Sequence, residues 1–250
     1  MKTLALLLAG LLTSSLCVAE MLPASDTFSQ TYPVAANVEI SLANINGAVE
    51  ITGWDKNEIS LEAEKRAASP EDLAKLQIEV TAAEKSFSIK TKFAQGGFFV
   101  RKTNGEVNYK LHVPATAKLS AIHVVNSNVA IAGILGEVNV DSVNGAIHAD
   151  TLAQNASLTT VNGSVVVRLA ASADKRSIYL HSVNGSCKVA LPEKFIGSFD
   201  ASTVNGKITC SLPHAKLTGS RNKLQGAFGD AAGTTVEASS VNGSILFEPL

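Results

Sequence analysis

Seven acidic residues in the downstream half of the chain have the side chains best suited to catalysis. Paired carboxylates hydrolyse glycosidic bonds, and carboxylates around a cation bind anionic polymers, when neighbouring elements hold them on one face. Asp141 with Asp150 is the best candidate pair. The acids fall at differing offsets from the repeated motif described below, so we expect no acidic row and favour ordinary solvated surface. They are Glu137, Asp141, Asp150, Asp174, Glu193, Asp200 and Glu237.

The histidines and cysteines offer no metal-binding spacing. Neither Cys187 nor Cys210 has a Cys or His at a zinc interval. The calcium-binding nonapeptide of secreted β-rolls, GGxGxDxUx, is absent. The histidines are His112, His123, His148, His181 and His214. We therefore predict no catalytic residue, no cofactor-binding residue, no cofactor and no metal site.

The motif that organises the chain is Val-Asn-Gly, with Ile for Val in the first copy. Its last five copies recur at intervals of 18, 22, 21 and 37 residues, which is typical of stacked coils. We expect the Asn and Gly of each copy to form a structural corner. These residues are Asn46 and Gly47, Asn144 and Gly145, Asn162 and Gly163, Asn184 and Gly185, Asn205 and Gly206, and Asn242 and Gly243.

The residues around each corner alternate as half-buried strands do. Positions six and four before the Asn are apolar in every copy, and so are positions three and five past it, whereas the position five before is mostly polar. Each copy is therefore predicted to be strand, corner, strand. Asn-Gly is also the signal for an antiparallel hairpin, so a meander of hairpins is the alternative, but the recurring apolar offsets favour a solenoid.

The corner residues have conformational and hydrogen-bonding roles of their own. Gly supplies a positive φ, and Asn tolerates the left-handed region. Stacked Asn amides can bond to one another, and we expect a parallel ladder of the hydroxyls two before each Asn. These are Ser142, Thr160, Ser182, Thr203 and Ser240. We expect these hydroxyls to form hydrogen bonds inside the corners rather than to face a ligand as a row.

The chain begins like an exported protein. Lys2, an apolar run over residues 4–12 and Ala19 predict a secretory signal peptide over residues 1–19, with cleavage after Ala19. Cys17 is a poor lipidation site because Leu16 stands where a small residue is needed. No other run is long enough to span a membrane as a helix.

Export implies a compartment that permits disulfides. Removal of Lys2 leaves 20 basic residues against 22 acidic ones, which gives no basic surface for nucleic acid. Cys187 and Cys210 stand three and five past their Asn residues, on what we expect to be adjacent coils. That diagonal is about 8 Å, which exceeds the limit of about 7 Å for an unstrained disulfide, so two buried thiols are favoured over a bond.

The segment before the coils interrupts the repeat. Ser69 as a cap, Pro70 and the acids after it predict a short helix, and residues 76–92 predict a hairpin. Trp54 is the lone Trp and is expected to cover the end of a core rather than to bind sugar. Asn126-Ser127-Asn128 is a degenerate first corner. Residues 207–242 hold either a looped-out coil or a flap.

The chain resembles a bacterial β-strand-repeat family of unknown function that is often labelled putative adhesin. The resemblance rests on NGAVEITGWDKNEISLEAEK, the Val113-Pro114 junction and the serial SVNGAI, TVNGSV, SVNGSC, TVNGKI and SVNGSI corners. It covers essentially the whole mature chain. It implies an exported β-solenoid and supplies no catalytic residues.

These observations predict an all-β protein, a single-stranded parallel β-helix, right-handed by the usual rule, with a strand-rich N-terminal cap and one short helix. The expected parts are a signal peptide (1–19), a strand-rich segment (20–115) and β-solenoid repeats (116–250). The predicted function is non-enzymatic binding or display in the periplasm or at the cell surface. The partner is an envelope polymer or protein, with no nucleic acid and no integral membrane segment. A self-associating scaffold and, less favoured, a polysaccharide-active enzyme are the alternatives.

Overall fold

The structure is a computed structural model that describes residues 23–93, 105–171, 175–213, 215–229 and 233–250. The predicted signal peptide, Asp174 and His214 lie outside the described residues. The described chain is all-β with one short helix, as predicted.

Seven pairs of strands, each joined by one corner, make up most of the fold, and we call each strand–corner–strand pair a unit. Each unit is named by its corner Asn. In chain order the units are β2 (Glu39–Asn46) with β3 (Val49–Trp54), β8 (Lys118–Asn126) with β9 (Val129–Ala132), β10 (Val138–Asn144) with β11 (Ile147–Leu152), β12 (Ala156–Asn162) with β13 (Val165–Leu169), β14 (Ser177–Asn184) with β15 (Cys187–Leu191), β16 (Gly197–Thr203) with β17 (Ile208–Cys210), and β20 (Thr234–Ser240) with β21 (Ile245–Pro249).

The remaining elements lie at the two ends of the stack. At the N-terminal end are β1 (Ala24–Pro33), β4 (Glu58–Ala67), α1 (Pro70–Lys75), β5 (Leu76–Ala83), β6 (Ser86–Phe93) and β7 (Gly105–Pro114). At the other end are β18 (Lys216–Gly219) and β19 (Lys223–Phe228).

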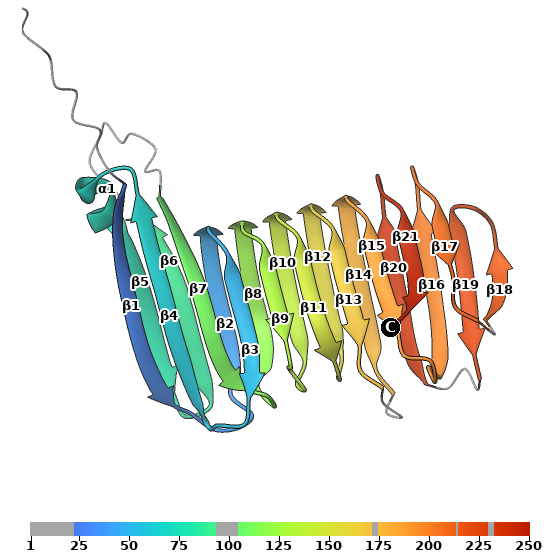
Figure 1. The fold of residues 1–250 in the computed structure, drawn as a ribbon, viewed down its shortest axis with the longest axis horizontal. Coiled ribbons are helices and arrows are strands. Elements are labelled where there is room, and N and C mark those ends of the chain that lie inside the picture. Colours follow the sequence, from blue (N-terminus) through green and yellow to red (C-terminus); the bar gives the residue numbers. More distant parts are fainter. Residues whose placement is uncertain (1–22, 94–104, 172–174, 214, 230–232) are drawn as a thin grey trace, which may run out of the picture.

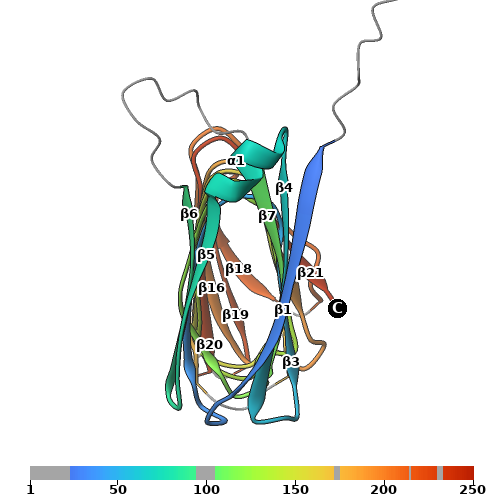
Figure 2. The same cartoon turned by 90° about the vertical axis from the view of Figure 1, so that its left-hand side faces the viewer.

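Two large mixed sheets face each other across the core (Figures 1 and 2). The ten-stranded sheet has the order β1-β4-β7-β3-β9-β11-β13-β15-β21-β17, and the eleven-stranded sheet has the order β18-β19-β16-β20-β14-β12-β10-β8-β2-β6-β5. Every unit therefore places its first strand in the eleven-stranded sheet and its second strand in the ten-stranded sheet. The corner carries the chain between the two layers.

Neighbouring units pair in parallel and in register at their corners. Asn144 pairs with Asn126 on one side and with Asn162 on the other, and Asn162 pairs with Asn184. The hairpin alternative for these corners is wrong, since strands joined by a corner belong to different sheets. The Asn46 unit stacks on the Asn126 unit in the same way, although residues 55–117 separate them in the sequence.

The predicted alternation is confirmed in the strands. In β12, for example, Ala156, Leu158 and Thr160 are buried, while Ser157 and Thr159 are partly exposed. The inward residues of all seven units form one continuous hydrophobic core with those of the N-terminal strands. Burial of this apolar surface is the main favourable term that holds the two sheets together.

The N-terminal strands differ from the units because they pair mostly antiparallel. In the ten-stranded sheet β4 lies antiparallel to β1 and to β7, and in the eleven-stranded sheet β5 lies antiparallel to β6. The short helix α1 begins where the sequence predicts, with Ser69 Oγ accepting a hydrogen bond from Asp72 N at 3.2 Å.

The C-terminal part does not follow the order of the sequence. The Asn242 unit, the last in the chain, lies between the Asn184 and Asn205 units, because β20 pairs with β14 and β16, and β21 with β15 and β17. The gap before it contains the antiparallel hairpin β18–β19, which pairs along β16. The chain therefore ends inside the stack, where Pro249 pairs with Leu191.

Candidate binding face

An unbroken ladder of asparagine amides runs along the corners of all seven units. Each Nδ2 donates to the Oδ1 of the neighbouring Asn at 2.7 to 2.9 Å. In spatial order the ladder is Asn46, Asn126, Asn144, Asn162, Asn184, Asn242 and Asn205. Asn126, from the degenerate corner, is a full member. Beyond Asn46 the ladder ends on the carbonyl oxygen of Gly105, 3.0 Å from Asn46 Nδ2.

The corner glycines are needed for close approach and not, as we expected, for a positive φ. Among them only Gly47 has a positive φ, of 109°, and no corner Asn has one. A Cβ at Gly163 would lie 2.1 Å from the carbonyl oxygen of Gly145, and one at Gly185 would lie 1.9 Å from that of Gly163. The φ expectation was wrong because the backbones of stacked corners leave no space for a methyl group, whatever their dihedral angles.

The hydroxyls two before each Asn do not bond to one another, which contradicts the expected hydroxyl ladder. Thr160 Oγ1 donates to the carbonyl oxygen of Gly145 at 3.0 Å, and Ser182 Oγ donates to that of Gly163 at 2.8 Å. Thr203 and Ser240 donate to the corner Gly of their neighbouring units in the same way, at 2.8 and 2.9 Å. These buried hydroxyls satisfy carbonyl groups inside the corner and do not face a ligand.

A row of aliphatic side chains lies on the outside, beside the Asn ladder. The residue directly before each corner Asn is Val or Ile in every unit and is partly or fully exposed. Exposed fractions are 37% for Ile45, 38% for Val125 and 42% for Val143. In spatial order the row is Ile45, Val125, Val143, Val161, Val183, Val241 and Val204. We call these seven side chains the aliphatic row.

A groove of about 490 Å³ follows the N-terminal half of this row. One wall is the aliphatic row from Ile45 to Val161, and the other wall carries the side chains two residues earlier in the same strands. These are Ala43, His123, Asp141 and Thr159, with Lys90 and Thr91 of β6 at the end. The groove thus crosses the outer face of β6, β2, β8, β10 and β12.

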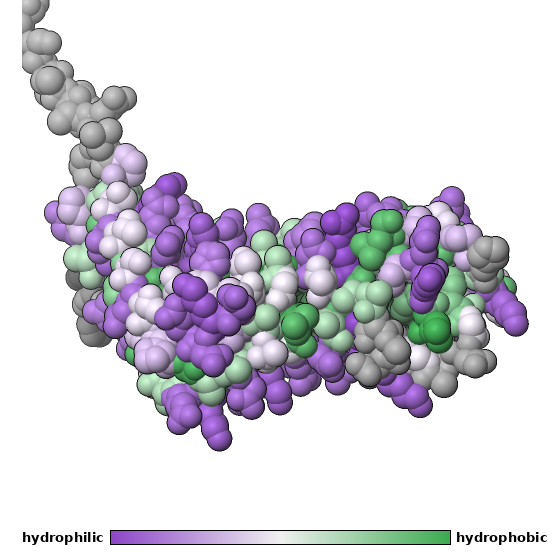
Figure 3. Space-filling view, turned by 60° about the horizontal axis from the view of Figure 1, so that its bottom comes forward, coloured by the Kyte–Doolittle hydropathy of each residue, from purple (hydrophilic) through white to green (hydrophobic). Residues whose placement is uncertain are grey.

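On the face shown in Figure 3, hydrophobic residues form separate patches among hydrophilic ones, which is ordinary for a protein surface. A row repeated in every unit is a different arrangement. Regular exposed apolar surface of this extent is typical of interaction sites.

The candidate acid pair is not brought together. Asp141 lies on β10 in one sheet, 3.2 Å from His123 Nδ1, and Asp150 lies on β11 in the other sheet, 3.6 Å from Arg168 Nη1. One pair of these acids does become aligned: Asp200 on β16 is directly opposite Glu237 on β20. Both stand five before their Asn, but their units are neighbours only because the Asn242 unit is inserted.

The other candidate residues are scattered. His181 Nδ1 lies 2.8 Å from Ser239 Oγ, and His112 stacks on Trp54 at 5.4 Å between ring centroids. Trp54 Nε1 donates to the carbonyl oxygen of Glu58 at 2.8 Å. Within the described ranges, no group of three or more His, Cys, Asp or Glu side chains is arranged to hold a metal ion.

Cys187 and Cys210 are free thiols. Our premise that they lie on adjacent coils is wrong, because β21 separates β15 from β17. Cys187 is fully buried, and burial raises the pKa of its thiol to about 12. Cys210, on the edge strand β17, is only half-buried, and burial raises its pKa while a backbone hydrogen bond with Leu212 opposes the rise.

A buried polar network closes the corner of the Asn46 unit. Thr91 Oγ1 donates to Asn44 Oδ1 at 2.9 Å and lies 2.8 Å from Tyr109 Oη, while Asn44 Nδ2 donates to the carbonyl oxygen of Val107 at 2.9 Å. Burial raises the pKa of Tyr109 to about 12. The network therefore replaces the Ser or Thr of the later corners with a wider set of bonds between β2, β6 and β7.

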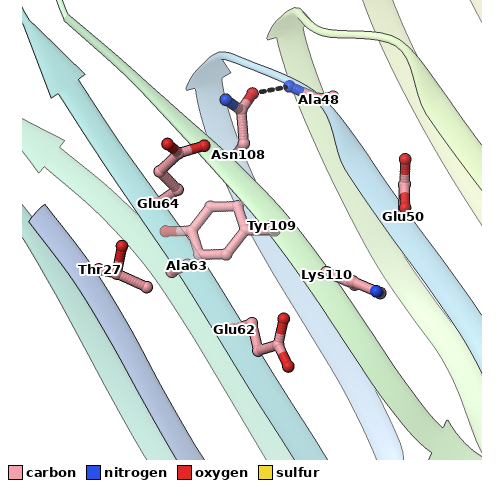
Figure 4. A pocket seen from close by; sticks show the side chains of 9 residues that line it. All are labelled: Thr27, Ala48, Glu50, Glu62, Ala63, Glu64, Asn108, Tyr109 and Lys110. Atoms are coloured by element: carbon pink, nitrogen blue, oxygen red, sulfur yellow. Dashed lines mark hydrogen bonds between the residues drawn. The ribbon is translucent and has the colours of Figure 1, made fainter. Parts of the chain in front are cut away.

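A second hollow, of about 340 Å³, lies over the ten-stranded sheet (Figure 4). Lys110 on β7 is directly opposite Glu62 on β4 and Glu50 on β3, and Figure 4 shows the two carboxylates on either side of it. Opposite charges on neighbouring strands stabilise a sheet. Charged residues from three neighbouring strands line this hollow beside Ala48, Ala63 and Tyr109, and we assign the Glu50, Lys110 and Glu62 arrangement to sheet stability.

Comparison with known proteins identifies solved structures that share this fold. No family model matches the chain, and no curated protein matches it. A putative cell adhesion protein from Clostridium sporogenes is similar in structure, with 12% sequence identity and a TM-score of 0.55, over 91% of this chain and 100% of the other. The likeness shows a shared fold.

Two further solved structures are similar at lower scores. One is a putative adhesin from Bacteroides fragilis, with 12% identity and a TM-score of 0.41, over 90% of this chain and 97% of the other. The second is a putative adhesin from Parabacteroides distasonis, with 14% identity and a TM-score of 0.37, over 89% and 97%. At the level of the fold, the similar structure from Clostridium sporogenes confirms the predicted resemblance to proteins labelled putative adhesin.

The described residues contain no helix that is long and apolar enough to cross a membrane. Sequence reasoning placed every corner Asn but missed the aliphatic row. The signal was available: Val or Ile precedes the Asn in every copy, at an outward position where a strand has no need of an apolar residue.

Proposed function

We propose that this protein is an exported, non-enzymatic binding protein of the adhesin type, in the periplasm or at the cell surface, that binds an envelope polymer or protein through its eleven-stranded sheet. The observation that carries the proposal is the aliphatic row beside the Asn ladder, repeated over seven units. The similarity to structures described as adhesins supports a binding role.

The remaining sequence predictions belong to the same proposal. Residues 1–19 act as a signal peptide, residues 20–115 form a strand-rich N-terminal segment, and residues 116–250 form a right-handed β-solenoid. Parallel pairing of successive units supports the solenoid. The end position of β1 and β4 to β6 in both strand orders supports a capping role for the first segment.

The test is a binding screen of the mature chain against envelope polymers and envelope extracts, with parallel assays for release of sugar ends. We expect saturable binding without turnover. The matched variant V125T/V143T/V161T keeps the shape of three row residues and removes apolar surface, and we expect it to lose most binding. Equal binding by this variant, or turnover by the wild type, contradicts the proposal.

Self-association is the second candidate, because two strands at the C-terminal end offer unpaired edges. β17 is the last strand of the ten-stranded sheet, and β18, exposed at all four residues, is the last of the eleven-stranded sheet. Open strand edges favour pairing with another chain. Light scattering over a range of concentrations tests this candidate, and a strict monomer rules it out. Polysaccharide cleavage has less support, since Asp141 and Asp150 lie in different sheets.

A further inference from the structure

The groove on the eleven-stranded sheet has the width of one unbranched chain. Its two walls stand on residues i and i+2 of the same strands, which are about 6.6 Å apart. It crosses five strands, from β6 to β12, and four strand spacings of about 4.8 Å give a length of about 19 Å. The ligand is therefore long, thin and aligned with the stack.

One wall is apolar from β2 to β12. Ile45, Val125, Val143 and Val161 follow one another in adjacent strands, with no polar residue between them. A ligand with polar groups at regular intervals would leave some of them facing this wall without partners, which is unfavourable. A polymethylene chain has no such groups.

Charge gives the groove a direction. Lys90 lines the end on β6, directly opposite Glu79 of β5, and the Glu79 carboxylate pairs with Lys92 Nζ at 2.6 Å. Asp141 lies three strands away, 3.2 Å from His123 Nδ1. An anionic head group is attracted to the Lys90 end and repelled from the Asp141 carboxylate.

Two other classes of ligand fit less well. A peptide that adds to a sheet needs free backbone groups, but β2, β8, β10 and β12 are paired on both sides. No Phe, Tyr or Trp side chain lines the groove, so flat sugar or base surfaces lack the large aromatic platforms on which they usually stack.

We propose that the groove binds a single-chain aliphatic acid, with its carboxylate at Lys90 and its tail against the aliphatic row. A staggered carbon chain, with bonds of about 1.52 Å and angles near 111°, advances roughly 1.25 Å per carbon, so about 15 carbons fill the groove. This inference rests on the proposed binding function and names its ligand class.

The experiment is titration of the mature protein with a fluorescent C16 fatty acid, kept below the concentration at which the acid forms micelles. Unlabelled acids from C8 to C20 are then used to displace it. We expect saturable 1:1 binding, with affinity that rises to about C14–C16 and then levels off. Hexadecyltrimethylammonium, of equal chain length and opposite charge, is expected to bind at least tenfold more weakly.

The variants separate the wall from the head-group site. V143T/V161T should weaken binding at least tenfold, and the matched variant V204T, in the row but beyond the groove, should bind as the wild type does. K90E should reverse the preference between the acid and the ammonium amphiphile. Circular dichroism of each variant checks that it is folded.

Three outcomes overturn the inference: no saturable binding of the acid, binding by V143T/V161T equal to that of the wild type, or an affinity that does not depend on the charge and chain length of the amphiphile. Sedimentation with vesicles of phosphatidylglycerol and phosphatidylethanolamine, without binding of the monomeric acid, assigns the face to a membrane surface instead. If the wild type retains envelope material and V143T/V161T does not, yet no acid binds, the binding function stands and only the ligand class is wrong. If envelope binding also fails, both the proposed binding function and the ligand class are wrong.

Discussion

The middle of the stack and its C-terminal end are built from the same motif but follow different rules of order. From the Asn126 unit to the Asn184 unit, each unit stacks on the one before it in the sequence. After that the chain leaves one position empty, forms the Asn205 unit and the β18–β19 hairpin, and returns to fill the position with the Asn242 unit.

The motif therefore defines how two corners stack on each other, but not which two corners do so. Asn242 donates to Asn184 at 2.8 Å, as Asn184 does to Asn162, so either later corner could occupy that place. The order at the C-terminal end is set by contacts outside the motif. Phe199 and Phe247 stack at 4.0 Å, and β19 pairs antiparallel along β16.

The largest expected effect comes from deletion of residues 234–250, which removes a unit paired on both sides. Because stacked units contact only their neighbours, we expect amides of residues 197–228 to exchange about 10³-fold faster or more, while residues 118–191 stay protected. Hydrogen exchange with mass spectrometry measures this. Retained protection over residues 197–228 would mean that the Asn205 unit stacks directly on the Asn184 unit and that the inserted Asn242 unit is not needed.

A smaller but still large effect is expected for Gly185→Ala in the middle of the stack, where the new Cβ would meet the carbonyl oxygen of Gly163 at 1.9 Å. We expect a loss of roughly 3–5 kcal/mol in the free energy of unfolding, measured by urea denaturation. Gly206→Ala meets Gly243 at 2.1 Å but lies in the end unit, which can shift outward, so it should be milder. The exposed neighbour Ser186→Ala is the control and should change stability by less than about 0.5 kcal/mol. Equal losses in the free energy of unfolding for Gly185→Ala and Ser186→Ala would contradict the close-approach explanation.

Removal of single ladder amides should separate the two regions again. Asn162 bonds to Asn144 and Asn184, whereas Asn205 bonds to Asn242 alone. Asn162→Ala should therefore cost about 2 kcal/mol and Asn205→Ala about 1 kcal/mol, at about 1 kcal/mol per hydrogen bond. Thermal and urea unfolding of both variants measure the ratio. A larger loss at Asn205 would show that the ladder does not carry this stability.

A further effect, smaller than that of Asn162→Ala, concerns pH. The thiol of Cys187 has a pKa of about 12 in the folded protein, against an ordinary value of 9.0. Its contribution to the free energy of unfolding is therefore complete below pH 9 and is lost as the pH rises toward 12. By pH 10 the loss should reach about 1.4 kcal/mol, and Cys187→Ala should remove it. Tyr109 adds a further loss only above its ordinary pKa of 10. Urea denaturation at pH 8, 9 and 10 is the measurement, and an unchanged pH slope in Cys187→Ala contradicts the assignment.

Much of the local structure could be predicted from the sequence. The strand faces follow from the alternation around each Asn, the start of α1 from Ser69 and Pro70, and the alignment of Asn126 from its place between apolar positions. These features depend on residues close together in the chain. The predicted signal peptide stays a prediction.

The groove and its ends could not be predicted because they join distant residues. Lys90 reaches the groove through pairing of β6 with β2, and the bond from Asn126 to Asn46 spans 80 residues. Asp200 and Glu237 become neighbours only through the inserted unit. The reason for the corner glycines also lies in the next unit, since the backbone of that unit excludes a methyl group.

The repeating unit follows from the sequence: two half-buried strands, their inward residues and an Asn-Gly corner whose amide bonds to its equivalent in the next unit. The tertiary structure alone decided the order of the units and the residues that share the outer face. The physical reason is that corners with the same backbone and the same amide offer equivalent edges. The contacts that distinguish the observed order include the stacking of Phe199 on Phe247 and the pairing of β19 along β16.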